Sequence, residues 1–286
     1  MEHQLIWDAA TLETRSVLPG AARVLTFSDN GKTILARFKD GTLKCCDVAT
    51  GKITREGPIA PLGEWTSVVV SPDRRSAAIT DGTAIIQVWD IASGKIDRLT
   101  GHTRNAAAFA FSPDGHMLVS SGLPGVIDVW NVARRQCVAS IPAHSSEVVS
   151  AAISPDGTMA ATGSADNTIK LWNLKTSSCL ATLNGHKRPV WALAFSPDGK
   201  TLASGSGDHS VRLWNVSFRR EVAVLRRFTS SKARLIEEIR TLNFSPDGND
   251  LAVVTQGGDL ILYRAATLDE LARRPDGAQA LPNAVR

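Results

Sequence analysis

The chain has 286 residues, of which 43% are hydrophobic and 21% charged, and a formal net charge of +4, a composition that excludes a disordered or low-complexity chain. Its apolar runs, such as Trp191–Phe195, are about five residues long and exclude a membrane-spanning helix, which needs ~20. The first residues contain no basic segment followed by an apolar stretch, so no signal peptide is predicted.

Short strands are predicted along the whole chain, beginning with residues 5–7 and 15–18, which form only half of a unit. Six units of four strands follow, each with a tight turn after its first strand, at 28–31, 71–74, 112–115, 154–157, 196–199 and 245–248. Four of these turns read Ser-Pro-Asp-Gly, in which proline presets φ, aspartate caps the backbone and glycine accepts a positive φ. The last unit is expected to close with residues 268–272.

The clearest unit has predicted strands at 190–195, 201–204 and 210–214, and residues 179–183 form the fourth strand of the unit before it. A second signature recurs where the third strand of each unit ends. It is an aromatic-polar pair or a decayed form of one: Trp7-Asp8, Cys46-Asp47, Trp89-Asp90, Trp130-Asn131, Trp172-Asn173, Trp214-Asn215 and Tyr263-Arg264. The intervals are 39, 43, 41, 42, 42 and 49 residues. Two signatures in step with one ~40-residue period predict a repeat architecture.

Two repeats also carry a His, a Ser or Thr, an Asp and a Trp at identical offsets: His144, Thr162, Asp166, Trp172 and His186, Ser204, Asp208, Trp214. With these sets and the Trp-Asp pairs, residues 4 to 274 resemble a WD-repeat β-propeller. The resemblance implies that the four side chains form a buried hydrogen-bonding network that joins the outer strands of a blade to its inner strands. Other repeats depart from the pattern: the repeat with His102, Ser120 and Trp130 has Pro124 at the Asp position, Cys46 replaces a Trp, and Tyr263 has Gly257 at the Asp position.

The resemblance implies an all-β fold with six complete four-stranded blades and an N-terminal half-blade, which we interpret as a seven-position ring. Residues 1–274 would form the propeller, and residues 275–286 a disordered C-terminal tail. Two alternatives are a six-bladed ring with an extra hairpin, and a fragment of a longer protein.

The His, Ser and Asp residues resemble a catalytic triad. The same set recurs from blade to blade, however, and an enzyme rarely builds one site several times. No phosphate-binding loop, metal-ligand cluster or pair of carboxylates is evident in the sequence. We therefore expect a protein that is not an enzyme, with no cofactor and no metal. The alternative is an enzyme with a site in the central channel.

Partner-binding residues are predicted on the face that carries the loops before each first strand and after each second strand. The family's contact positions select Arg23, Lys39, Glu64, Asn105, Glu147, Val149, Trp191, Glu238 and Arg240, with weaker candidates at Thr66, Ala107, Pro189 and Gln256. Trp191 is the strongest of them because aromatic residues often dominate binding energy. An apolar Trp191 with charged neighbours suits a peptide that has an apolar anchor and basic flanks. The alternative is that Trp191 packs inside its blade.

The opposite face is predicted to be basic, with Lys32, Arg74, Arg75, Lys95, Arg134, Arg135, Lys175, Lys200, Arg219 and Arg220. The aspartates of the tight turns stand among these residues, and no aromatic residues are interleaved for base stacking. We interpret this face as a solvated rim rather than a nucleic-acid site.

Three further predictions concern the setting of the protein. The four cysteines fit no disulfide or zinc spacing and are interpreted as buried thiols in a reducing cytoplasm. The segment 228–238 is a longer loop on the predicted binding face, and loops often carry function. We predict a scaffold that binds a protein or peptide and no membrane. The alternative is the sensory or scaffolding tail of a larger signalling protein.

Overall fold

The structure is a computed structural model, and it describes residues 3–7, 13–27, 32–59, 67–80, 84–101, 109–122, 124–226, 238–264 and 284–285. Every regular element in these ranges is a β-strand, which confirms the predicted all-β fold. The chain forms two compact units. Unit 1 is Met1–Leu123 with Ile127–Ile141, and unit 2 is Pro124–Val126 with Pro142–Arg286.

Unit 1 begins with a two-stranded sheet of β1 (His3–Trp7) and β2 (Thr14–Pro19). Two four-stranded sheets follow: β3 (Ala21–Phe27), β4 (Thr33–Phe38), β5 (Thr42–Asp47) and β6 (Ile53–Ile59), then β7 (Val68–Val70), β8 (Ser76–Thr80), β9 (Ile86–Asp90) and β10 (Ile96–Leu99). A third sheet, β11 (Phe109–Phe111), β12 (Met117–Gly122), β13 (Val126–Asn131) and β14 (Gln136–Pro142), belongs to this unit except for Val126 and Pro142. The expected half-unit is thus a pair of strands, and the sheets after it have four strands each.

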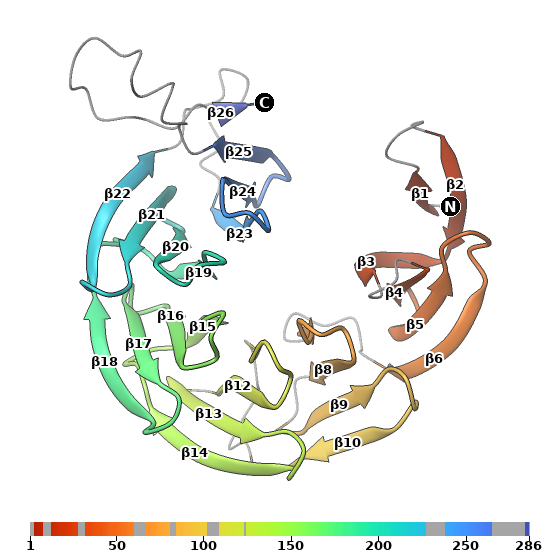
Figure 1. Cartoon of the computed structure of the whole chain (residues 1–286), viewed down its shortest axis with the longest axis horizontal. Helices are drawn as coiled ribbons and strands as arrows, with labels where there is room; N and C mark the ends of the chain where they lie inside the picture. The colour runs from red at the N-terminus through yellow and green to blue at the C-terminus, as the bar shows by residue number, and fades with distance from the viewer. Residues whose placement is uncertain are drawn as a thin grey trace. The chain divides into compact units, whose positions relative to one another are not determined.

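Unit 2 contains three four-stranded antiparallel sheets (Figure 1). They are β15 (Val148–Ile153), β16 (Met159–Ser164), β17 (Ile169–Asn173) and β18 (Ser178–Leu183); β19 (Val190–Phe195), β20 (Thr201–Ser206), β21 (Ser210–Asn215) and β22 (Arg220–Arg226); and β23 (Ile239–Phe244), β24 (Asp250–Thr255), β25 (Leu260–Arg264) and β26 (Ala284–Val285). Within this unit the first strands are neighbours, because β15 lies beside β19 and β19 beside β23 (Figure 1).

The fourth strand of the last sheet differs from the expected one. The segment 268–272 lies outside the described residues, and the strand that pairs with β25 in the structure is β26. It is the only part of the expected tail, 275–286, that the structure describes. Val285 pairs with Leu262 and Ala284 with Tyr263.

The tight turns have the capping geometry that their sequence predicts. In the turn at 154–157, Ser154 Oγ donates to Asp156 Oδ1 over 2.5 Å, and the amide of Thr158 donates to the same oxygen over 3.0 Å. Gly157 has a φ of 71°, which L-residues with a side chain rarely adopt. The turn therefore fixes the register between the first two strands of the sheet.

The core of unit 2 lies between neighbouring sheets. One cluster joins Leu171 of β17 to Val190 of β19, Leu202 of β20 and Trp214 of β21. A four-stranded sheet cannot bury both of its faces alone, so each repeat depends on the next for its core.

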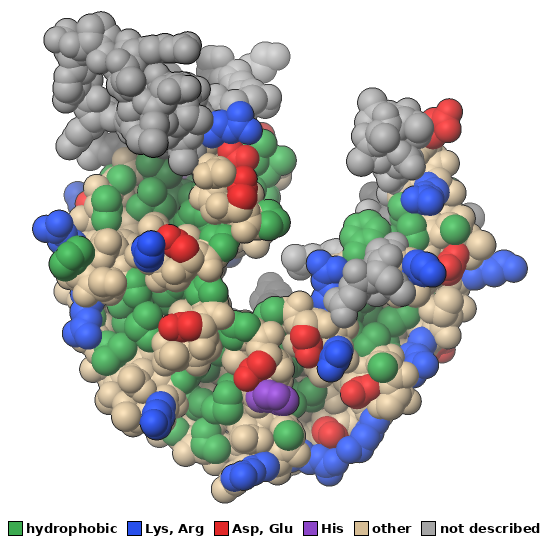
Figure 2. All heavy atoms as spheres, in the orientation of Figure 1, with side chains coloured by type: hydrophobic (Ala, Val, Ile, Leu, Met, Phe, Trp, Pro, Cys, Tyr) green, Lys and Arg blue, Asp and Glu red, His purple; other side chains and the backbone are tan. Residues whose placement is uncertain are grey.

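Charged side chains of both signs are interspersed on the face drawn in Figure 2.

The cysteines depart in part from expectation. All four are free, and Cys45 and Cys46 are buried, where burial raises the pKa of both thiols, that of Cys45 to about 11. Cys179, predicted to be buried, is exposed. It lies on β18, the fourth and outermost strand of its sheet, where Ser178 and Thr182 are also exposed.

Candidate functional site

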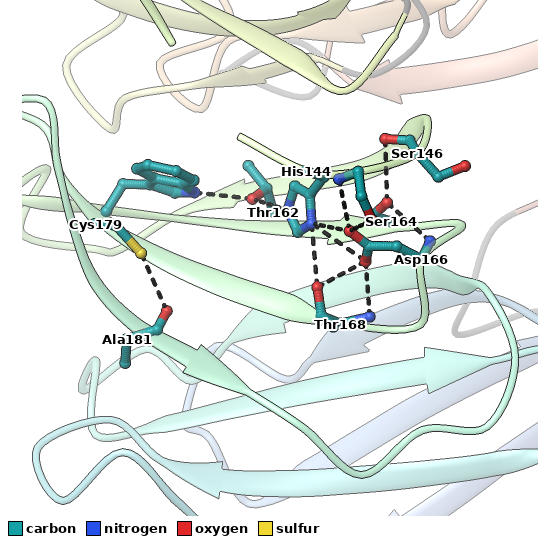
Figure 3. A network of polar contacts seen from close by, with 10 residues as sticks. His144, Ser146, Thr162, Ser164, Asp166, Thr168, Cys179 and Ala181 are labelled. Atoms are coloured by element: carbon teal, nitrogen blue, oxygen red, sulfur yellow. Dashed lines mark hydrogen bonds and ion pairs between the residues drawn. The ribbon is translucent and has the colours of Figure 1, made fainter. Parts of the chain in front are cut away.

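The first polar cluster lies in the sheet of β15 to β18 (Figure 3). Thr162 Oγ1 accepts a hydrogen bond of 2.8 Å from Trp172 Nε1 and lies 2.8 Å from His144 Nε2. On its other side, His144 Nδ1 lies 3.0 Å from Asp166 Oδ2. The carboxylate also accepts hydrogen bonds from the amides of Ser145 and Thr168. One continuous chain of contacts therefore joins the indole to the turn that contains Asp166.

The same arrangement is repeated in the next sheet. Ser204 Oγ accepts a hydrogen bond of 2.8 Å from Trp214 Nε1 and lies 2.8 Å from His186 Nε2. On the other side of the ring, His186 Nδ1 lies 3.0 Å from Asp208 Oδ2. Asp208 also accepts from the amides of Lys187 and Ser210, over 2.9 and 3.0 Å. The structure thus brings together both sets of four residues that the sequence selects.

Burial and hydrogen bonding set the charge states in the first cluster. Burial lowers the pKa of His144, although the nearby Asp166 opposes this effect. For Asp166, burial would raise the pKa, but hydrogen bonds from Thr168, from the amide of Ser145 and the proximity of His144 together lower it to about 2. The His144 side chain is 0% exposed and that of Asp166 is 11% exposed, so the protein itself encloses nearly all of both side chains.

The incomplete repeats keep only parts of this cluster. Trp130 Nε1 donates to Ser120 Oγ over 2.8 Å, while His102 lies outside the described residues. In the repeat of Trp89 the residue ten positions earlier is Ile79 instead of Ser or Thr. Trp89 Nε1 is buried and has no hydrogen-bond partner among the described residues.

A second group of residues lies where the first strands of unit 2 begin. The pairing of each first strand with its second strand contains a β-bulge, between Val148 and Ser150, between Val190 and Ala192 and between Ile239 and Thr241. The extra residues are Val149, Trp191 and Arg240. A bulge bends the strand and redirects a side chain, and bulges are common beside binding sites.

Backbone hydrogen bonds hold the loops around these bulges. The carbonyl of Glu147 accepts from the amide of Ala165, that of Pro189 from Gly207, and that of Glu238 from Gln256, over 2.8 to 2.9 Å. Each bond joins the loop before a first strand to the turn after the second strand of the same sheet. The bulge residues of the neighbouring strands β15, β19 and β23 therefore occupy equivalent positions on one side of unit 2.

Trp191 has well-defined surroundings. The guanidinium of Arg240 lies over its ring, with Cζ 4.5 Å from the ring centroid. Arg240 Nη2 is 2.7 Å from Glu238 Oε2. Gly207 leaves room for the indole, since a Cβ there would be 3.2 Å from Trp191 Nε1 and 3.4 Å from Glu238 Oε1. Trp191 Nε1 is buried and has no hydrogen-bond partner among the described residues.

The other predicted contact residues are distributed unevenly. Glu147 and Val149 are half-buried and Lys39 is exposed, and the side chain of Arg23 is not described. The pairing of β3 with β4 has two register shifts; the extra residue of the first is Ala22, whereas Arg23 pairs with Arg37. The candidates Glu64, Thr66, Asn105 and Ala107 lie outside the described residues, as does most of the loop 228–238. Among the strongest candidates, Arg240 contacts both Trp191 and Glu238.

The basic residues of the opposite side stand beside acidic ones. Asp97 pairs with both Lys95 and Arg135, over 3.3 and 2.8 Å. Lys200 Nζ lies 3.8 Å from Asp198. Figure 2 shows acidic side chains among the Lys and Arg side chains. Within the described ranges, no helix has the length and apolar character to cross a membrane, and no group of three or more His, Cys, Asp or Glu residues is placed to hold a metal ion.

Comparisons with known proteins point to one family. The family described as "WD domain, G-beta repeat" matches residues 93–131, 135–173 and 177–215. Each matched segment runs from the fourth strand of one sheet through the third strand of the next, and each ends at a Trp-Asn pair.

Similar proteins come from distant organisms, and each similarity is partial. WD repeat-containing protein 1-B of Xenopus laevis is 29% identical over 104 residues, which are 35% of this chain and 17% of that protein. WD repeat-containing protein 55 of Bos taurus is 27% identical over 117 residues, 41% of this chain and 30% of that protein. The WD repeat-containing protein sll1491 of Synechocystis is 33% identical over 135 residues, 46% of this chain and 38% of that protein. The chain therefore matches well under half the length of these relatives.

Proposed function

Because the chain belongs to the WD-repeat family, we propose that it is a non-catalytic scaffold that binds a protein or peptide. We place the binding site on the side of unit 2 where the three bulges lie. We define the bulge surface as Glu147, Val149, Trp191, Glu238 and Arg240. The proposal extends to the contact residues that the sequence selects in unit 1, Arg23, Lys39, Glu64 and Asn105.

The observation that carries this proposal is the repeated bulge. Three neighbouring first strands insert an extra residue at the same register, and the three residues are Val149, Trp191 and Arg240. A half-buried tryptophan at such a position offers a large rigid contact area to a partner, and tryptophan is enriched among residues that dominate binding energy. The charged Glu147, Glu238 and Arg240 would then select the partner.

The buried His-Asp clusters favour a structural role over catalysis. Each histidine lies between a hydroxyl and a carboxylate, and the side chains of His144 and His186 are 0% and 1% exposed. A general base must reach the proton that it removes from the substrate. We propose that these clusters support the sheets, and that the protein requires no cofactor.

The experiment that tests the function is selection of peptides on the intact chain. A random peptide library displayed on phage is selected on the immobilised wild-type protein, and affinities are then measured for Trp191→Ala and for the control Lys175→Glu. Lys175 is exposed and lies in the turn between β17 and β18, at the opposite end of its sheet from the bulge. Loss of a central aromatic contact often costs at least ~2 kcal/mol, or about 30-fold in affinity.

The outcomes separate the two surfaces of unit 2. Peptides whose affinity falls about 30-fold or more with Trp191→Ala, and changes little with Lys175→Glu, support the bulge surface as the binding site. Peptides that depend on Lys175 and not on Trp191 would show that binding uses the basic turns. A second control, Arg135→Glu, is less suitable because Arg135 is paired with Asp97.

We also propose that the protein acts in the cytoplasm, either alone or as the scaffolding part of a longer signalling protein. The adjacent buried thiols Cys45 and Cys46 suit a reducing compartment. Fluorescent tagging of the full-length gene product would test this, and accumulation in an oxidising compartment would reject it.

A further inference from the structure

The strongest feature outside the buried clusters is the contact of one arginine with both an aromatic ring and a carboxylate. Arg240 lies over the ring of Trp191, 4.5 Å from its centroid, and forms an ion pair of 2.7 Å with Glu238. A cation is stabilised over the face of tryptophan by the charge distribution of the ring. The ring and the carboxylate together have the chemistry of a binding site for a cation, and in this structure an arginine of the same chain occupies it.

The residues around the Trp191 ring and the Glu238 carboxylate favour a site in which both groups are already in place in the free protein. Gly207 has no side chain, and the space that a Cβ would take is bordered by Trp191 Nε1 at 3.2 Å and by Glu238 Oε1 at 3.4 Å. The carbonyl of Glu238 accepts from the amide of Gln256, and that of Pro189 from the amide of Gly207. The backbone on both sides of the indole is therefore fixed, while the side chain of Arg240 is 40% exposed. Both contacts of the arginine are made by its guanidinium end, and its side chain is more exposed than that of Glu238, which is 29% exposed.

We propose that Trp191 and Glu238 form a recognition site for a guanidinium or ammonium group of the partner, and that Arg240 occupies this site in the free protein. The inference rests on the proposed function and names the chemistry of its ligand, a basic side chain. Binding requires Arg240 to leave the ring. Only the molecules in which Arg240 has left the ring can bind the partner, so the apparent affinity is the intrinsic affinity multiplied by the fraction of such molecules. Arg240 therefore competes with the partner for the site.

The test uses the full chain labelled with ¹⁵N at tryptophan, and it follows the indole N–H signal of Trp191, which is assigned by its loss in Trp191→Phe. The probe is N-acetyl-arginine amide, with N-acetyl-norleucine amide as the uncharged control and N-acetyl-glutamate amide as the acidic control. The signals of the other six tryptophans report whether each variant is folded.

Arg240→Ala should bind the arginine probe about tenfold more tightly than the wild-type protein does, because the competitor is removed. Adding Glu238→Gln to Arg240→Ala should reverse that gain. Arg188→Ala serves as the matched control, because it removes an exposed arginine whose Cβ also lies near Gly207, and it should leave the affinity unchanged. Arg240→Gln repeats the test with a polar replacement if the alanine variant is not folded.

Three results would overturn the inference: no gain of affinity with Arg240→Ala or Arg240→Gln, a gain that survives Glu238→Gln, or tighter binding of the glutamate probe to the wild-type protein. The last result would show that Arg240 binds an acidic partner. If the arginine probe fails while selected peptides still require Trp191, the cation site is rejected and the proposed scaffold function stands.

Discussion

The indole of Trp130 donates its Nε1 hydrogen to Ser120 Oγ, ten residues earlier in the chain, over 2.8 Å. The same offset joins Trp172 to Thr162 and Trp214 to Ser204. The hydroxyl stands on the second strand of the sheet and the indole on the third, so one side-chain bond fixes their relative register. Wherever the hydroxyl is missing, the indole has to find another acceptor or stay unpaired.

Trp89 is the case where the hydroxyl is missing, and it gives the first prediction. Ile79 occupies the hydroxyl position and is 0% exposed, and Trp89 Nε1 has no partner among the described residues. Ile79→Thr should supply one. Ile79→Val, which removes a methyl group without adding a hydroxyl, should cost about 0.5–1.5 kcal/mol. The threonine variant should be more stable than the valine variant by about 1 kcal/mol.

Urea denaturation of the two variants measures this difference. A threonine variant less stable than the valine variant would mean that the new hydroxyl does not reach Trp89 and is buried without a partner.

Asp208 gives the second prediction. It accepts hydrogen bonds from the amides of Lys187 and Ser210 and lies 3.0 Å from His186 Nδ1. Asp208→Ala leaves these groups, of which His186 and Ser210 are buried, without this acceptor and should lower the free energy of unfolding by about 1–3 kcal/mol. Asp198→Ala is the matched control, since Asp198 caps an exposed turn, and it should cost less. An unchanged melting temperature for Asp208→Ala would remove the basis for a stabilising network.

The third prediction concerns pH. Burial lowers the pKa of His144 below its ordinary value of 6.5, so the unfolded chain binds the proton more readily. This contribution to stability is complete above pH 6.5 and is lost as the pH falls below it. The pKa of Asp166 is lowered from 3.8 to about 2. Its contribution to stability is likewise lost on acidification, as the pH falls from 3.8 toward 2.

The free energy of unfolding should therefore be lower at pH ~5 than at pH ~7.5, and His144→Gln should reduce that difference. Urea titrations of both proteins at high salt, which screens exposed charges, provide the measurement. An identical pH dependence in the variant would exclude His144 as its source.

The fourth prediction concerns β1. This strand pairs only with β2 in the described structure, so its second edge has no ladder of hydrogen bonds. Amide hydrogens of His3–Trp7 should exchange faster than those of Val190–Phe195 in β19, because few contacts oppose local opening. Hydrogen exchange followed by mass spectrometry resolves the two peptides. Equal protection would indicate that a further segment or a second molecule covers that edge.

Most of the repeat architecture could be predicted from the sequence because local chemistry specifies it. Turn residues such as Ser154 and Asp156 interact within a few positions, and the offset from Ser204 to Trp214 is the same in several repeats. The strand predicted at 190–195 is confirmed as β19. The missing acceptor of Trp89 could have been found in the same way, by reading Ile79 at the hydroxyl position.

The details of the bulge surface could not be predicted by such reading. Arg240 lies 49 positions after Trp191, beyond a loop whose length differs from that of its equivalents, and its contact with the ring depends on the way β19 lies beside β23. The exposure of Cys179 depends in the same way on which face of β18 its neighbours cover. Periodicity describes one repeat at a time and carries no information about such packing.

The order of the strands has a consequence for how the protein is made. In each of the sheets β15 to β18 and β19 to β22, the four strands pair in the order in which they occur in the chain. Pairing between consecutive strands closes short loops, which favours rapid folding. A nascent chain can therefore form these sheets one after another during synthesis, as each set of strands leaves the ribosome. In the last sheet, by contrast, β25 must wait for the distant β26, so its edge stays open longer than those of the third strands β17 and β21 and is more exposed to mispairing in a newly made molecule.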